Sequence, residues 1–218
     1  MKIDLMARYP KTNRQGYLDR SSALTADEIK IAKQFGKEYF DGDRKFGLGG
    51  YHYNEKFFNL VVEDFIEHYK LDKNSSVLDV GSGKGFMLHD FKRKIPQLEV
   101  AGVDISQYCY ENAMESIKPY LQIGSCDKLP FDDNSFDLVI AIATIHNLDK
   151  AGVKKSLEEI VRVTKKDAFI KVNGYKTEDE RGKLEGWNLV ANTILHEEEW
   201  LELFNETGYI YDYDFFVP

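Results

Sequence analysis

A short apolar strand that runs directly into a glycine-rich loop is the feature that most limits the fold of this chain. Residues 77–80 are apolar apart from Asp79, and the loop 81–85 that follows has the sequence Gly-Ser-Gly-Lys-Gly. Apolar residues then recur with helical spacing until Pro96, a residue that helix interiors exclude. The segment therefore predicts strand, glycine loop and helix, which is the opening unit of a parallel α/β sheet.

The same alternation of strand and helix patterns continues along the chain. Further strands are expected at 100–103, 120–123, 138–143 and 168–172, and helices at 55–69, 86–95, 106–117, 153–161 and 197–207. Strands that alternate with helices imply right-handed crossovers and a mainly parallel, doubly wound sheet with both faces covered. Residues 209–217 alternate aromatic side chains with Asp, so we expect one or two edge strands there, antiparallel to the rest.

Two segments, 1–54 and 173–195, lie outside this alternation. Residues 41–53 are too rich in glycine for a helix and too polar for a core. Long insertions beside a parallel sheet often determine specificity. We therefore expect 1–54 to be an N-terminal helical and loop extension that acts as a lid, 55–218 to be the main domain, and 173–195 to be an insertion on its substrate side.

Composition and charge restrict the partners. The chain of 218 residues has 29 Lys and Arg against 37 Asp and Glu, a net charge of −8. This balance disfavours nucleic acid as a partner. The longest apolar run, 138–143, is far shorter than the roughly 20 residues that span a bilayer, and the first residues lack a signal-peptide pattern, so no membrane insertion is expected. Two cysteines are too few for a zinc cage or a disulfide framework, which favours a cytoplasmic protein without a metal. Nothing in the sequence selects an oligomeric state.

Carboxylates are expected at three neighbouring strand ends. Asp79 lies in the first strand, Asp104 closes the second, and Asp127 follows the third. Ligands of open parallel sheets bind at this edge, where the strand order reverses. A carboxylate beside the loop opposes a pyrophosphate, and the loop has GxGxG rather than the dinucleotide GxGxxG spacing. S-adenosylmethionine (AdoMet), which is cationic and has no phosphate, meets this description.

Three motifs follow one another in a fixed order: 77–85, then 103–106 (Val-Asp-Ile-Ser), then 127–131 running into 134–139. In this order and spacing they resemble the class I AdoMet-dependent methyltransferases, in the small-molecule branch similar to the ubiquinone and menaquinone methyltransferases. The resemblance covers roughly residues 55–172. It implies a Rossmann-like, seven-stranded sheet and the transfer of a methyl group by in-line displacement to a small-molecule acceptor.

The resemblance also implies AdoMet as the cofactor and S-adenosylhomocysteine as its product. The implied cofactor contacts are Asp79, Gly81, Gly83, Asp104, Ile105, Cys126, Asp127 and Ala143. The substrate-side candidates, from the two segments outside the alternation, are Arg44, Tyr51, Tyr53 and Trp187.

A general base is useful if the acceptor carries a proton on the attacking atom. His146 follows the fourth strand on the ligand edge, and its ordinary pKa of about 6.5 suits proton removal near neutrality. A loop histidine that bonds to nearby backbone explains its position equally well. Many relatives have two adjacent histidines, or a histidine and an aromatic residue, at this point, whereas here His146 is followed by Asn147. His52, in the glycine-rich segment, is the second candidate base.

Three other functions remain open from the sequence. The first is a methyltransferase whose acceptor is a protein or peptide. The second is a non-catalytic domain that binds AdoMet without transferring the methyl group. The third is a nicotinamide-dependent oxidoreductase on a similar sheet, which the position of Asp79 disfavours.

Overall fold

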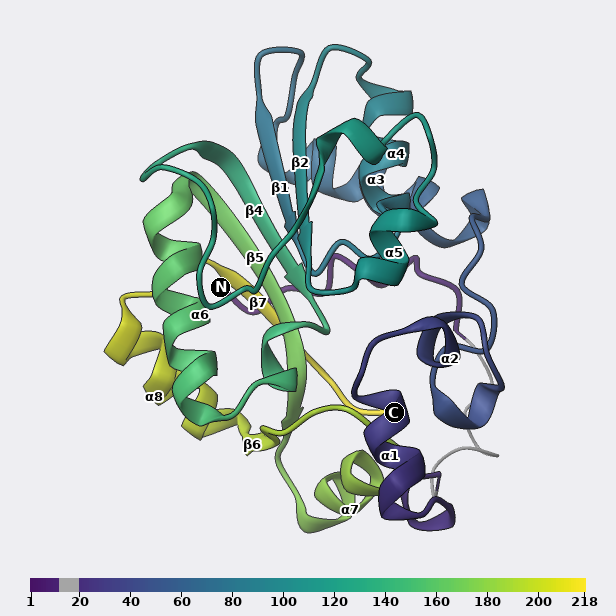
Figure 1. Cartoon of the computed structure of the whole chain (residues 1–218). Helices are drawn as coiled ribbons and strands as arrows, with labels where there is room; N and C mark the ends of the chain where they lie inside the picture. The colour runs from purple at the N-terminus through teal and green to yellow at the C-terminus, as the bar shows by residue number, and fades with distance from the viewer. Residues whose placement is uncertain (12–19) are drawn as a thin grey trace.

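A computed structural model describes residues 1–11 and 20–218 and places one twisted sheet between two layers of helices (Figure 1). The strands are β1 (Ser76–Val80), β2 (Glu99–Asp104), β3 (Leu121–Ile123), β4 (Phe136–Ile142), β5 (Thr164–Tyr175), β6 (Leu195–His196) and β7 (Asp212–Phe216). The helices are α1 (Ala26–Ala32), α2 (Lys37–Phe40), α3 (Glu55–Tyr69), α4 (Phe86–Lys94), α5 (Gln107–Glu111), α6 (Lys150–Val163), α7 (Glu178–Trp187) and α8 (Glu197–Thr207).

The described residues form a seven-stranded sheet in the order β3-β2-β1-β4-β5-β6, with β7 also paired to β5. The pairs within it run parallel, which confirms the doubly wound α/β class expected from the alternation of patterns. The strand order reverses between β1 and β4, so the carboxyl ends of these two strands open a crevice.

The prediction of an antiparallel edge strand is wrong. β7 pairs with β5 in parallel, with Phe169 opposite Asp212 and Asn173 opposite Phe216. The reason lies in the preceding elements, because β6 has only two residues and passes directly into α8 instead of a hairpin. The helix α8 returns the chain to the end of the sheet at which β5 begins, so the last strand runs in the same direction as β5.

Each face of the sheet is covered by helices whose apolar stripes were visible in the sequence. α6 and α8 cover one face, where the buried Leu157 and Trp200 pack against the side chains of β4 and β5. α3 and α4 cover the other face, where Phe65 and Phe91 pack against β1 and β2. Within the part of the chain that the structure describes, every helix is too short or too polar to span a bilayer.

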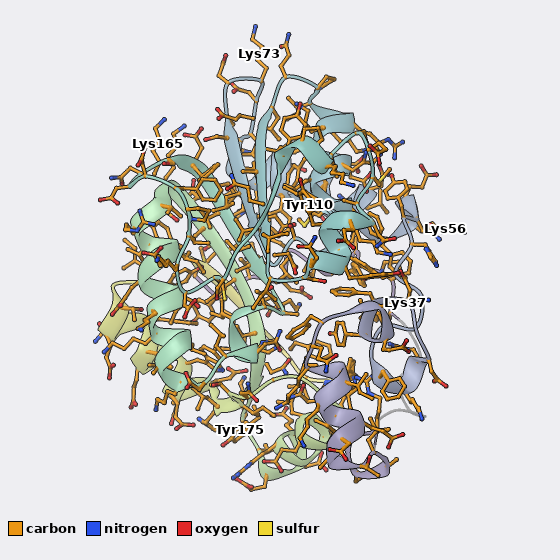
Figure 2. The ribbon with its side chains drawn as sticks, in the orientation of Figure 1. Lys37, Lys56, Lys73, Tyr110, Lys165 and Tyr175 are labelled. Atoms are coloured by element: carbon orange, nitrogen blue, oxygen red, sulfur yellow. The ribbon has the colours of Figure 1, made fainter. Side chains whose placement is uncertain are left out.

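Two segments from distant parts of the sequence, 20–51 and 178–192, meet beyond the carboxyl ends of the strands, and together we call them the cap. The Arg20 guanidinium stacks on the Trp187 ring and donates to its carbonyl oxygen, and the Ser21 hydroxyl donates to the Glu185 carbonyl. Figure 1 shows α1, α2 and α7 gathered at this end. In Figure 2, Lys73 and Lys165 project into solvent at the opposite end of the sheet, away from Tyr175.

The cap occupies the position in which a lid was expected. Whether residues 1–54 and 173–195 act as separate units stays a prediction, and residues 12–19 of the first segment lie outside the described residues.

Candidate functional site

Two cavities open at the crevice between β1 and β4, one of about 280 Å³ and the other of about 740 Å³. The smaller cavity lies against the glycine loop, and the larger one lies against β5, β7 and α7. The residues that line both cavities are Tyr9, Tyr39, Phe58, Ile142, Ala143 and Asn147. The two cavities therefore share a wall at the carboxyl end of β4.

The glycine loop takes a backbone shape that side chains would prevent. Gly81 has φ +83°, and a Cβ atom there would lie 2.0 Å from Thr144 Oγ1. Gly83 has φ +54°, and both glycines line the smaller cavity. The glycines thus let the loop pass close to β4 and leave the cavity floor as bare backbone.

Asp104 at the end of β2 holds this loop in place. One carboxylate oxygen accepts the Gly83 N–H at 2.8 Å, and the other accepts the Ser106 N–H at 2.8 Å. Burial raises the pKa of Asp104, and these two N–H groups oppose the rise. Each oxygen keeps a second lone pair. Because Asp104 lines the smaller cavity, it can still accept hydrogen bonds from a ligand.

Asp79 is a buried carboxylate without a counter-charge. The residue is 6% exposed and lies outside both cavity linings, and among the described residues its side chain has neither a hydrogen bond nor an ion pair. Burial and the negative charge of Asp104 raise its pKa to about 7. A carboxylate in this state gains most from a cation placed beside the glycine loop.

Of the other expected cofactor contacts, some line a cavity and one does not. Ile105 and Cys126 line the smaller cavity, and Ile105 is 60% exposed although it is apolar. Ala143 lies in the wall between the two cavities and has φ +55°. Asp127 is outside both linings and accepts a hydrogen bond from the hydroxyl of Ser125.

A buried ion pair ties the cap to the glycine loop, and the sequence did not predict it. The Lys84 ammonium contacts the Asp41 carboxylate at 2.5 Å and donates to the Tyr51 carbonyl oxygen at 2.8 Å. The Tyr108 hydroxyl also donates to Asp41. This network holds Tyr51 against Gly83, where its ring lines the smaller cavity. The one available signal was the lysine inside the glycine loop.

His146 lies in the wall of the larger cavity and is 4% exposed. Its Nδ1 atom accepts the backbone N–H of Asn173 at 3.3 Å, and burial lowers its pKa to about 4. A ring nitrogen that accepts an N–H carries no proton, so the neutral ring is protonated on Nε2. Of the two interpretations offered by the sequence, this geometry matches the histidine bonded to backbone.

Three other candidates lie away from both cavities. His52 is 79% exposed, Tyr53 bonds to Asp90 and Arg93 on α4, and Arg44 donates to the Gly47 carbonyl within the cap. We therefore carry no catalytic or substrate role forward for them. Trp187 does line the larger cavity. In the described ranges no group of three or more metal-ligating side chains occurs.

Comparison with known proteins gives this site a family. Residues 77–167 match the family model of the methyltransferase domain. YcgJ, an uncharacterized methyltransferase of Bacillus subtilis, is 32% identical over 112 residues, which are 47% of this chain and 42% of that protein. A demethylmenaquinone methyltransferase of Symbiobacterium thermophilum is 34% identical over 110 residues, which are 47% of this chain and 43% of that protein. Over residues 77–167 this chain therefore resembles the methyltransferase domain family.

The fold of the methyltransferase domain agrees with solved structures. The crystal structure of YcgJ from Bacillus subtilis superposes with a TM-score of 0.56 at 22% identity, over 67% of this chain and 66% of that one. The sequence matches span less than half the length of these relatives. The family model covers the chain from β1 to the first residues of β5, and both parts of the cap lie outside its range, residues 77–167.

Proposed function

We propose that this methyltransferase domain transfers a methyl group from AdoMet to a small-molecule acceptor. Asp79 carries the proposal, because a buried carboxylate with a pKa near 7 beside a bare glycine loop fits a cationic ligand. The same carboxylate repels a diphosphate, which argues against a nicotinamide cofactor.

The residues around the smaller cavity fit the parts of AdoMet. Asp79 lies outside the lining itself, and its negative charge, just before the lining residues Gly81 and Gly83, is suited to the cationic amino-acid end. Asp104 has free acceptor lone pairs for the two ribose hydroxyl groups. The exposed apolar face of Ile105 is suited to the adenine, and Cys126 lines the same cavity.

The chemistry that AdoMet supplies when bound is an electrophilic methyl group on a sulfonium. In the proposed reaction the carbon–sulfur bond breaks, sulfur keeps the electron pair, the acceptor bonds to the methyl carbon, and the acceptor's proton passes to solvent. The protein's part is alignment, which contributes about 7–11 kcal/mol in well-oriented reactions. The donor and the acceptor would be aligned across the wall between the two cavities, which Ile142, Ala143 and Asn147 form.

The larger cavity supports a small molecule as the acceptor. Its volume of about 740 Å³ lies in the range of ligand pockets, and the cap residues Trp187, Leu189 and Val190 line it. A protein acceptor would need to present a single side chain to this space, and the cap would have to move aside.

Titration calorimetry with S-adenosylhomocysteine tests the cofactor site. Asp104→Ala removes two acceptors and the anchor of the loop, so we expect the affinity to fall at least about 30-fold. Asp132→Ala, at an exposed carboxylate on a distant loop, is the matched control and should bind like the wild type. Lack of binding by the folded wild-type protein would refute the proposal, and transfer of a labelled methyl group to a small molecule would support its second half.

A further inference from the structure

The wall of the larger cavity contains two buried polar side chains that the proposed cofactor site does not use. His146 is 4% exposed and Asn173 is 8% exposed, and both line this cavity. They are held together by the hydrogen bond from the Asn173 backbone N–H to His146 Nδ1. Because the Asn173 carbonyl also accepts the Trp200 indole N–H, the backbone at this point is fixed from both sides.

The remaining polar atoms of these two side chains have no partner among the described residues. His146 Nε2 and the side-chain amide of Asn173 make no hydrogen bond to any residue that the structure describes. Both residues are largely buried, but these atoms are not sealed off from the cavity, so they are available to bind a ligand there. With its proton on Nε2, His146 offers a donor, while the amide of Asn173 offers both a donor and an acceptor.

The remaining surroundings restrict the ligand further. Phe58, Ile142 and Phe216 give the cavity apolar walls. Lys171, which lines this cavity together with Lys11 and Arg20, is already bound by Asp4 and Asp214, so the Lys171 cluster presents no unpaired positive charge to a carboxylate. The site favours an uncharged oxygen on a bulky apolar molecule.

We propose that His146 and Asn173 bind a hydroxyl or carbonyl oxygen of a bulky, uncharged and largely apolar acceptor, with His146 as a hydrogen-bond donor through Nε2 and not as a base. The proposal rests on the proposed function only where it identifies the ligand as the methyl acceptor, because the His146–Asn173 pair and the larger cavity are independent of the cofactor site. His146 is accordingly a positioning residue that selects the acceptor and sets its orientation beside Ala143.

The first test measures the tautomer of His146 without any ligand. In the protein with ¹⁵N-labelled histidine, long-range ¹H–¹⁵N spectra distinguish the two ring nitrogens, and the His146→Gln spectrum assigns the signal among the 5 histidines. We expect a neutral ring protonated on Nε2 from pH 5.5 to 8. A proton on Nδ1, or titration near pH 6.5, overturns the proposal.

The second test uses 2-naphthol and naphthalene as matched probes with and without a hydroxyl group. Titrated into protein saturated with S-adenosylhomocysteine, 2-naphthol should bind about five- to tenfold more tightly. His146→Gln, whose amide N–H replaces the Nε2 donor but is no base, should keep this preference. His146→Phe and Asn173→Leu should remove it, and His52→Gln at an exposed position should not change it.

Equal binding of the two probes by the wild type, binding of neither, or loss of the preference in His146→Gln overturns the proposal. The Gln variant and the tautomer measurement stand even if His146→Phe fails to fold. Affinity for S-adenosylhomocysteine is measured first, and the probe titrations are repeated without it. Failure of cofactor binding therefore refutes the proposed function, while the probe preference decides the role of His146 separately.

Discussion

The ammonium group of Lys84 lies 2.5 Å from a carboxylate oxygen of Asp41, and the two side chains are 5% and 12% exposed. This pair joins the glycine loop to a residue that lies 43 positions earlier in the chain and belongs to the cap. The ion pair therefore holds the cap and the glycine loop together at this point.

Lys84→Met should lower the free energy of unfolding by about 3–5 kcal/mol, because it leaves the Asp41 carboxylate buried without its partner. The double variant Lys84→Met, Asp41→Asn should recover part of this loss, since no unpaired charge remains. Lys154→Met, which breaks an exposed pair with Glu206, is the control and should cost less than about 1 kcal/mol. Urea denaturation measures all three, and equal losses for Lys84 and Lys154 would contradict the buried pair.

Asp79→Asn should stabilise the ligand-free protein at pH 8 and hardly change it at pH 4. The unfolded chain ionises this group near pH 4, whereas the folded protein keeps the proton to about pH 7. Between these values the folded state binds more protons at Asp79, so the contribution of this group to stability falls as pH rises, by up to about 4 kcal/mol. Thermal unfolding across this range measures the difference, and a variant that gains nothing at pH 8 would contradict a buried, unpaired carboxylate.

The same group makes cofactor binding dependent on pH. A cationic ligand prefers ionised Asp79, so the affinity for AdoMet should rise by up to about tenfold per unit up to pH 7 and then level off. Calorimetry at pH 6 in two buffers of different ionisation enthalpy should detect close to one proton released. Affinity that is flat from pH 5.5 to 8 would show that Asp79 does not face the cation.

The contribution of His146 to stability should fall as pH decreases from about 6.5 to 4, which opposes the contribution of Asp79 in the same window. The pKa of His146 is about 4 in the folded protein and near 6.5 in the unfolded chain, so the unfolded state binds the proton first in this window. The loss amounts to about 3 kcal/mol for this residue alone. His146→Gln should flatten that part of the stability profile in urea denaturation, whereas His52→Gln should leave it unchanged.

Gly81→Ala should destabilise the protein by at least about 1–3 kcal/mol, because φ +83° is unfavourable for alanine and the new Cβ would meet Thr144. Gly182→Ala is the matched control. Gly182 lies on α7 with open space around its Cβ position, so alanine there should stabilise by about 0.5–1 kcal/mol. Opposite signs for the two substitutions are the expected result in thermal unfolding.

The sequence predicted the elements whose patterns are local. α3 and α8 have the expected bounds because their apolar stripes and their ends, Asn54 before α3 and Gly208 after α8, are encoded nearby. The helix after Ser106 ends at Glu111 rather than near residue 117. Ile117 is buried as a helical pattern would require, but it reaches the core from a turn, which apolar spacing does not distinguish from a helix.

What the sequence missed depends on contacts between distant residues. Lys84 and Asp41 are unremarkable polar residues until the fold buries them together. The direction of β7 follows from the two-residue length of β6, and pairing rather than composition sets that length. For His146 the position was predictable, but the ring nitrogen that faces the backbone depends on Asn173, 27 residues away.

Tyr39 and Asn147 belong to the linings of both cavities. If the ligand that binds first fixes these two side chains, the second ligand loses less conformational entropy when it binds. Donor and acceptor should therefore bind with positive and reciprocal cooperativity, each raising the affinity for the other by the same factor. Because the coupling is reciprocal, the two ligands reach the same ternary complex with the same total free energy, whichever of them binds first.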